Sequence, residues 1–216
     1  MVAASKIIQD VYYADRGETD RREKIRIIVN FSGRYSLASK RDINGDRKEF
    51  ACRVVNMSQR GMALVGPVIG PINERVIVYL PRFGTIEGRV CRHFKHGFIM
   101  TISGNEEAHE RIAAKLEWLE NNKNHDAPDG RRYARIVLRN PWSILTLPDQ
   151  SVLSCMVIDT SLTGAAVSAD VELPAGSKVS VGKIGGRIVR RLKAGLAIKF
   201  DAAVSPHLLE EFLLTE

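Results

Sequence analysis

Two groups of residues that could together bind a small anion occur twice in the chain, in the same order. The first copy consists of Arg22, Arg26, Asn56, Ser58 and Gly61, and the second of Arg131, Arg135, Asp159, Ser161 and Gly164. An arginine guanidinium offers a planar fork of donors to phosphate oxygens or to the O6/N7 edge of guanine. A carboxylate or amide oxygen can accept from the N–H groups on the opposite edge of that base. Arg-x-x-x-Arg with Asx-x-Ser-x-x-Gly can therefore bracket a guanine and its phosphate.

A third motif repeats without an evident chemical role. The segment 88–97 matches 186–195, and both contain Gly-Arg-x-x-Arg. The offsets between copies are 109 for Arg22 and Arg131, 103 for Asn56 and Asp159, and 98 for the third motif. Because the order is kept while the spacers shrink, the chain is expected to hold two copies of one domain with trimmed loops.

The elements that must position these residues are short strands. The expected strands are 25–31, 50–55, 62–65, 76–80, 86–91 and 97–102 in the first half, and 134–138, 152–158, 165–168, 178–181, 186–190 and 195–200 in the second. Alternating or β-branched segments with Gly and Pro between them predict a mainly β fold, with a small six-stranded antiparallel barrel in each half. Helical spacing of apolar residues predicts an amphipathic helix after each barrel, over 105–121 and 205–215.

The expected domains are an N-terminal segment 1–19, a first barrel plus helix 20–120, a linker 121–130, and a second barrel plus C-terminal helix 131–216. The net charge of +7 is unevenly placed. Residues 21–60 hold eleven basic and four acidic side chains, whereas residues 103–130 hold three basic and seven acidic ones. This arrangement favours a local anion site over a uniformly cationic surface.

Cysteine usage and hydropathy predict a cytoplasmic protein. The three cysteines are widely spaced and odd in number, which fits neither a disulfide framework nor a zinc pattern. Polar residues interrupt the apolar ones in the first 19 positions, so no signal peptide is expected, and no segment has the ~20 apolar residues of a membrane span.

The paired motifs resemble the signature of the PilZ domain, a bacterial six-stranded β-barrel that is a receptor for the second messenger cyclic di-GMP. The final strand, 195–200, also resembles that of the family, and the match covers about 20–120 and 129–216 as a tandem pair. The resemblance implies that the arginines hold guanine edges and phosphates. The implied residues are Arg21, Arg22, Arg26, Asn56, Ser58 and Gly61 in site 1, and Arg131, Arg132, Arg135, Asp159, Ser161 and Gly164 in site 2.

The two copies differ in ways that bear on the ligand. Arg21 precedes the first Arg-x-x-x-Arg, whereas Gly130 precedes the second. In similar domains an arginine at that place goes with binding of a stacked dimer of cyclic di-GMP. Copy one also has Asn56 where copy two has Asp159, and an amide is a weaker acceptor than a carboxylate. The resemblance thus implies a dimer at site 1 and leaves site 2 open.

Other functions remain as alternatives. A tandem-barrel binder of single-stranded nucleic acid would need exposed aromatic platforms, and aromatic residues make up only 6% of the chain. An adaptor with one degenerate nucleotide site is the third reading.

Cys91, His93 and His96 suggest a metal, but copy two has Val189, Arg191 and Ala194 there, so no metal or cofactor is expected. No enzyme motif is present, so no catalytic activity is expected. The resemblance implies an effector that signals to an unidentified protein partner in motility, exopolysaccharide or related lifestyle control.

Overall fold

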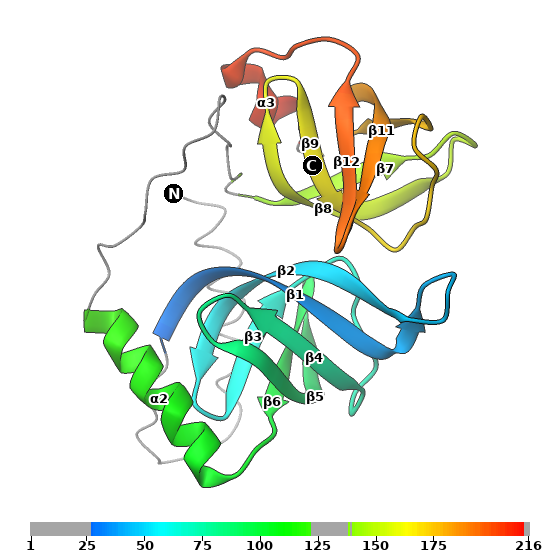
Figure 1. Cartoon of the computed structure of the whole chain (residues 1–216). Coiled ribbons are helices and arrows are strands. Elements are labelled where there is room, and N and C mark those ends of the chain that lie inside the picture. The colour runs from blue at the N-terminus through cyan, green and yellow to red at the C-terminus, as the bar shows by residue number, and fades with distance from the viewer. Residues whose placement is uncertain (1–26, 122–137, 139, 214–216) are drawn as a thin grey trace. The chain divides into compact units, whose positions relative to one another are not determined.

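The computed structural model describes residues 27–121, 138 and 140–213. The chain divides into two compact units, residues 1–129 and 130–216. Each unit contains one closed barrel of six antiparallel strands, followed by a helix (Figure 1). The predicted fold class, two small six-stranded barrels with a helix after each, is confirmed.

The first barrel is closed by pairing between strands that are far apart in sequence. Its strands are β1 (Ile27–Arg41), β2 (Arg47–Ser58), β3 (Gly61–Val65), β4 (Arg75–Leu80), β5 (Gly84–Phe94) and β6 (Gly97–Ile102). Their order around the barrel is β1-β2-β3-β6-β5-β4, and β4 pairs with β1 through Tyr35 and Val78. The barrel therefore has no open sheet edge in its described part.

The second barrel repeats this order with strands of equal or shorter length. Its strands are β7 (Trp142–Thr146), β8 (Val152–Ser161), β9 (Gly164–Ser168), β10 (Lys178–Val181), β11 (Ile184–Leu192) and β12 (Gly195–Phe200). They follow one another as β7-β8-β9-β12-β11-β10, and β10 pairs with β7 through Val181 and Leu145. The sequence repeat is therefore a repeat of topology.

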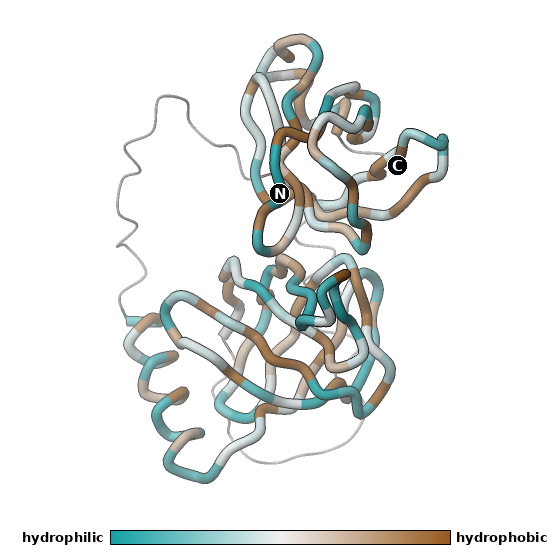
Figure 2. The backbone as a smooth tube through the Cα atoms, turned by 45° about the vertical axis from the view of Figure 1, so that its right-hand side comes forward, coloured by the Kyte–Doolittle hydropathy of each residue, from teal (hydrophilic) through white to brown (hydrophobic). Residues whose placement is uncertain are grey.

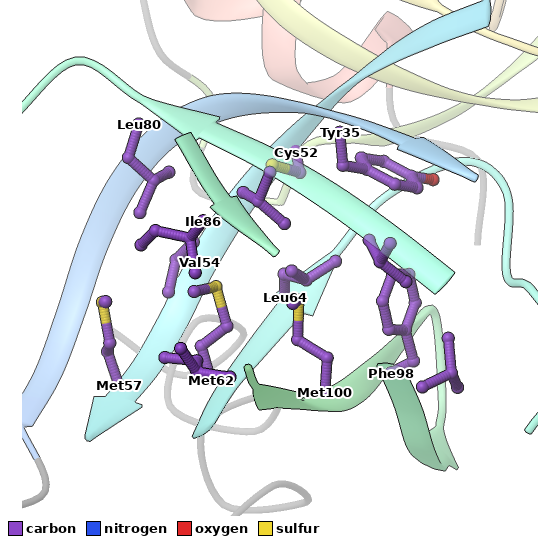
Figure 3. Packing of buried hydrophobic residues seen from close by; sticks show 14 of the residues in the cluster. Tyr35, Cys52, Val54, Met57, Met62, Leu64, Leu80, Ile86, Phe98 and Met100 are labelled. Atoms are coloured by element: carbon purple, nitrogen blue, oxygen red, sulfur yellow. The ribbon is translucent and has the colours of Figure 1, made fainter. Parts of the chain in front are cut away.

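Alternation along the strands gives each barrel an interior and an outer face. In Figure 2 the backbone colour switches between hydrophobic and hydrophilic along the strands of both units. Figure 3 shows side chains from several strands of the first barrel meeting in its interior, among them Val54, Leu64, Ile86 and Met100. The second interior is filled in the same way by smaller residues, including Val157 and Val167. Each half thus buries its own core.

Helix α2 (Glu106–Asn121) covers part of the first barrel. Asn105 caps it, because its Oδ1 accepts from the Ala108 N–H at 3.0 Å. Leu116 is buried in the barrel core and Ile112 packs against it, as the helical spacing predicted. His109 is also buried, which was not predicted, and its Nε2 lies 3.1 Å from the Ile102 carbonyl oxygen.

Helix α3 (Pro206–Leu213) closes the second barrel in the same role. Leu209 and Leu213 are buried in its core. The turn between β10 and β11 meets the end of this helix, where the Lys183 N–H donates to the Phe212 carbonyl at 2.8 Å. The apolar residues of this helix therefore pack into the core of its own barrel, as expected.

The first strand of each barrel differs from its prediction. β1 begins at Ile27, inside the expected strand 25–31, and continues to Arg41. Residues 25 and 26 of that prediction lie outside the described residues. In the second half the expected strand 134–138 lies outside the described residues except for Leu138, which is in no strand. The strand that closes the barrel is instead β7, whose apolar residues follow Asn140-Pro141. β7 was not predicted because it has only 5 residues and directly follows residues that favour a turn.

Glycines of the repeated third motif are required by close backbone contacts. A Cβ built on Gly88 would lie 1.7 Å from the Thr101 carbonyl oxygen, and one on Gly186 would lie 2.5 Å from that of Lys199. Both oxygens belong to the neighbouring strand, which cannot move without opening the barrel. The repeat of this motif therefore has a structural cause.

All three cysteines are free thiols. Cys52 and Cys155 are buried, and burial raises the pKa of each to about 12. Cys91 is exposed. Within the described residues, no helix has the length and apolarity needed to cross a membrane.

Candidate functional site

The second motif of copy one forms the turn of a tight hairpin. Ser58 ends β2 and pairs with Gly61 at the start of β3, so only two residues connect the strands. The Ser58 hydroxyl donates to the Gly61 carbonyl oxygen at 3.2 Å. Asn56 lies two residues earlier on β2 and is half-buried. The three predicted residues of this motif are thus held on one rigid hairpin.

The second motif of copy two forms the same hairpin. Ser161 pairs with Gly164, and its hydroxyl donates to the Gly164 carbonyl oxygen at 3.3 Å. Its oxygen also lies 3.5 Å from the Thr163 N–H, so part of its role is to fix the turn. With the hydroxyl proton used inside the hairpin, the serine oxygen can act toward a ligand as an acceptor. The N–H groups of a guanine edge are donors, which suits such an oxygen.

A β-bulge sets the direction of the Asx side chain in both barrels. The pairing of β2 with β3 shifts by one residue between Val54 and Asn56. The pairing of β8 with β9 shifts between Val157 and Asp159. Val54 and Val157 point into the cores, and the extra residue after each lets the Asx lie on the outer face together with the serine. The bulge positions correspond in the two copies.

The two motif glycines face different constraints. A Cβ on Gly164 would lie 2.4 Å from the Ile198 carbonyl oxygen, whereas one on Gly61 would lie 3.2 Å from that of Met100. Glycine is needed in the second barrel for strand packing as well as for any approach of a ligand. This structural role was not predicted from the sequence.

Arg60 connects the first hairpin to helix α2. It lies inside the Asn56–Gly61 motif and is ion-paired with Glu106 in the first turn of the helix. Both side chains are well exposed, so the pair stabilises the fold by only about 0–1 kcal/mol. Copy two has Thr163 at the corresponding place. In copy one, an acidic residue of the helix therefore contacts a basic residue of the candidate hairpin, and Thr163 cannot make the same ion pair in copy two.

The third sequence motif contributes an arginine to the same outer face. Across the second barrel, Asp159 pairs with Ala166, Ala166 with Ala197, and Ala197 with Arg190. We call these four residues the aspartate row. It spans three strand spacings, about 14 Å. The matching row of the first barrel is Asn56, Ala63, Ile99 and Arg92. Strand register therefore puts Arg190 and Arg92 at the far ends of the rows that begin at Asp159 and Asn56. The repetition of the third motif could have suggested that its arginine belongs to the site.

The arginines of the Arg-x-x-x-Arg motifs lie outside the described residues. These are Arg21, Arg22 and Arg26 of site 1, and Arg131, Arg132 and Arg135 of site 2. Their position next to the hairpins stays a prediction.

Cys91, His93 and His96, which suggested a metal, have separate surroundings. The Cys91 Sγ lies 3.3 Å from the Ile99 carbonyl oxygen, and the His93 Nε2 lies 2.8 Å from that of Gly70. Burial, with the nearby Lys95 charge, lowers the pKa of His96. Among the described residues, no three His, Cys, Asp or Glu side chains are grouped as metal ligands would be.

No protein-family model matches the chain, and no curated protein matches it either. Several solved structures are similar over most of its length. The PlzA protein of Borreliella burgdorferi in complex with c-di-GMP is 12% identical, with coverage of 96% of this chain and 97% of that one and a TM-score of 0.26. The inhibitor of motility MotI/DgrA of Bacillus subtilis is 11% identical, with coverage of 87% and 94% and a TM-score of 0.30.

YcgR from Escherichia coli, also in complex with c-di-GMP, is 14% identical, with coverage of 98% of this chain and 86% of that one and a TM-score of 0.25. Similarities this distant do not assign a family to the chain.

Proposed function

We propose that the chain is a tandem PilZ-type receptor for cyclic di-GMP, with one site on the outer face of each barrel. The observation that carries the proposal is the paired hairpin. In both barrels a bulge turns an Asx outward beside a serine whose hydroxyl is held by the turn, at corresponding positions. The same local geometry on two different sequences is what a shared binding function requires.

The residues have complementary roles in the proposed sites. Asn56 and Asp159 accept from the guanine N–H groups, with the serine oxygens beside them. The arginine pairs Arg22/Arg26 and Arg131/Arg135 donate to the other edge of the base and to the phosphates. Because a carboxylate accepts more strongly than an amide, Asp159 gives the second site the stronger guanine contact.

A competition measurement tests the ligand class. Labelled cyclic di-GMP is bound to the intact chain on filters and challenged with unlabelled cyclic di-GMP, GTP or single-stranded RNA. The proposal expects displacement by cyclic di-GMP alone at low concentration. Displacement by RNA would identify a nucleic-acid binder instead, and absence of binding would indicate an adaptor that has lost its nucleotide sites.

The sequence difference before the arginine pairs predicts unequal stoichiometry. Site 1 should take a dimer of cyclic di-GMP because Arg21 adds a cation for the four phosphate charges of two ligands, whereas Gly130 adds none at site 2. Arg21→Gly should therefore reduce the number of ligands bound at site 1, measured by calorimetry in the chain carrying Arg131→Ala/Arg135→Ala. An unchanged number after this substitution would refute the assignment.

We also propose that ligand binding changes the arrangement of the two barrels. Arg131 and Arg135 follow directly after the expected linker 121–130, so fixing them against Asp159 and Ser161 would restrict the connection between the units. A ligand can shift this equilibrium only through its different affinity for the two arrangements, and the arginine bonds supply that difference. Solution scattering should change on saturation with cyclic di-GMP, and superimposable profiles would exclude the rearrangement.

The signalling role follows from these proposals. The protein would act in the bacterial cytoplasm as a non-enzymatic effector, whose ligand-bound arrangement is recognised by a protein partner. Motility, exopolysaccharide production and related changes of lifestyle are the processes that such receptors would control.

A further inference from the structure

A line of cations crosses the outer face of the second barrel beside the aspartate row. Lys178 on β10 pairs with Arg187 on β11, and Arg187 pairs with Lys199 on β12. Lys199 then pairs with Gly164, the motif glycine, which pairs with Ser161. We call these five residues the lysine row. Its three cationic side chains are exposed, and they lead directly to the candidate hairpin.

No carboxylate in the part of the chain that the structure describes neutralises the charges of this row. Like charges directly opposite each other on neighbouring strands destabilise a sheet. Within the described residues, none of the three cations has a carboxylate within ion-pair distance, and Arg187 makes only a 3.4 Å contact with the Gly176 carbonyl oxygen. Asp201 lies over Gly185, next to the row, but outside ion-pair distance of its cations. An external anion would relieve this repulsion.

The corresponding row of the first barrel has two cations instead of three, and one of them is paired with a carboxylate. Its corresponding row contains Arg75, Arg89 and Thr101. The Glu87 carboxylate holds Arg75 through two contacts, Nε–Oε1 at 2.6 Å and Nη2–Oε2 at 2.8 Å, and this pairing lowers the pKa of Glu87. At the places of Thr101 and Glu87 the second barrel has Lys199 and Gly185. The second barrel therefore gains a cation at Lys199, and its acid at this place, Asp201, comes from the end of β12 and forms no ion pair with the row among the described residues.

Small residues adjoin Lys199 and the hairpin on the second barrel, and one of them, Ala166, is buried. Gly164, Ala166 and Ala197 lie side by side on the outer faces of β9 and β12. The first barrel has the branched Ile99 where the second has Ala197, so its surface is raised at that point. A planar base can approach the backbone closely where side chains are small, and a cation on the neighbouring strand can then reach its phosphate. The second barrel offers both.

We propose that the lysine row is the phosphate-binding side of the second site, with Lys199 in contact with a phosphate of a nucleotide whose base lies on Gly164 and Ala197. This proposal rests on the proposed function. It also makes the two sites chemically distinct. Site 1 draws its additional cation from Arg21 before the barrel, whereas site 2 draws it from the barrel wall.

Lys199→Thr tests the proposal and keeps the fold, because threonine is the residue that the first barrel has at this place. The full chain carrying Arg22→Ala/Arg26→Ala, which removes site 1, is titrated with cyclic di-GMP at low and high salt. Lys199→Thr should weaken binding about tenfold at low salt and flatten its salt dependence, since one screened charge contact is lost. Lys199→Arg should retain affinity.

Lys183→Thr is the matched control, because this exposed lysine of the same barrel lies in the β10–β11 turn, outside both rows. It should leave affinity and salt dependence unchanged. Equal behaviour of Lys199→Thr and Lys183→Thr would overturn the proposal while leaving the proposed function intact. If the chain binds no cyclic di-GMP, the proposed function fails. In that case the full chain is titrated with inorganic pyrophosphate. If Lys199→Thr does not weaken pyrophosphate binding relative to Lys183→Thr, the proposal that the lysine row binds phosphate is overturned.

Discussion

Replacing both arginine pairs, Arg22→Ala/Arg26→Ala with Arg131→Ala/Arg135→Ala, should abolish binding of cyclic di-GMP. Each arginine in the proposed sites makes charge-assisted hydrogen bonds worth roughly 1.5–3 kcal/mol. Loss of two at one site therefore weakens that site by more than about a hundredfold. Calorimetric titration of the quadruple variant should show no saturable heat at ligand concentrations that saturate the unmodified chain.

The two half-variants are matched controls for one another, because each removes the same number of charges from one barrel. Each should lose one site and keep the other. Lysine at the same positions keeps the charge but not the planar fork, so Arg→Lys variants should recover only part of the affinity. Unchanged binding by the quadruple variant would contradict the assignment of the arginines.

Gly88→Ala should destabilise the first barrel by about 3 kcal/mol, because its Cβ would overlap backbone as well as the movable Met100 side chain. The Cβ would lie 1.7 Å from the Thr101 carbonyl oxygen and 2.8 Å from its carbonyl carbon. Only a separation of β5 from β6 could relieve the overlap. Hydrogen exchange followed by mass spectrometry resolves the barrels, and β5 and β6 should lose protection while the second barrel keeps it.

Gly61→Ala provides the comparison in the same barrel. Its Cβ would lie 3.2 Å from the Met100 carbonyl oxygen, a contact that a shift of a few tenths of an ångström relieves. We expect its effect to stay within about 1 kcal/mol. Equal protection in Gly88→Ala and the unmodified chain would show that the close strand contact is not required.

The fold could be predicted because its determinants are local and repeated. Alternating apolar residues such as Val76, Val78 and Leu80 face the core as their spacing indicated. The helices after the barrels were predictable from apolar spacing, with Leu116 and Leu209 buried as expected. Duplication of the motifs indicated two domains because a single fold explains both copies.

The first strand of each barrel was harder to predict because long-range pairing determines it. Residues 32–41 are strand because β2 and β4 lie on either side of them, although Gly33 and Ser36 favour a turn locally. β7 is held in the same way by β8 and β10. Local preference is a weak guide where tertiary pairing decides the conformation.

The candidate site was predictable in part. Asn56, Ser58 and their counterparts could be found because motif and hairpin coincide in sequence. The lysine row could not, since Lys178, Arg187 and Lys199 come from three separate strands. Only the register shows that they are neighbours, and β-bulges shift that register by one residue in ways that composition does not reveal.

The most direct test of the central claim is calorimetric titration of the intact chain with cyclic di-GMP, beside the two half-variants of the arginine pairs. Our account predicts saturable binding with two classes of site, a ligand dimer at the first and at least one ligand at the second, and loss of one class in each half-variant. Absence of saturable heat from the unmodified chain, or one class of site that survives in both half-variants, would contradict it.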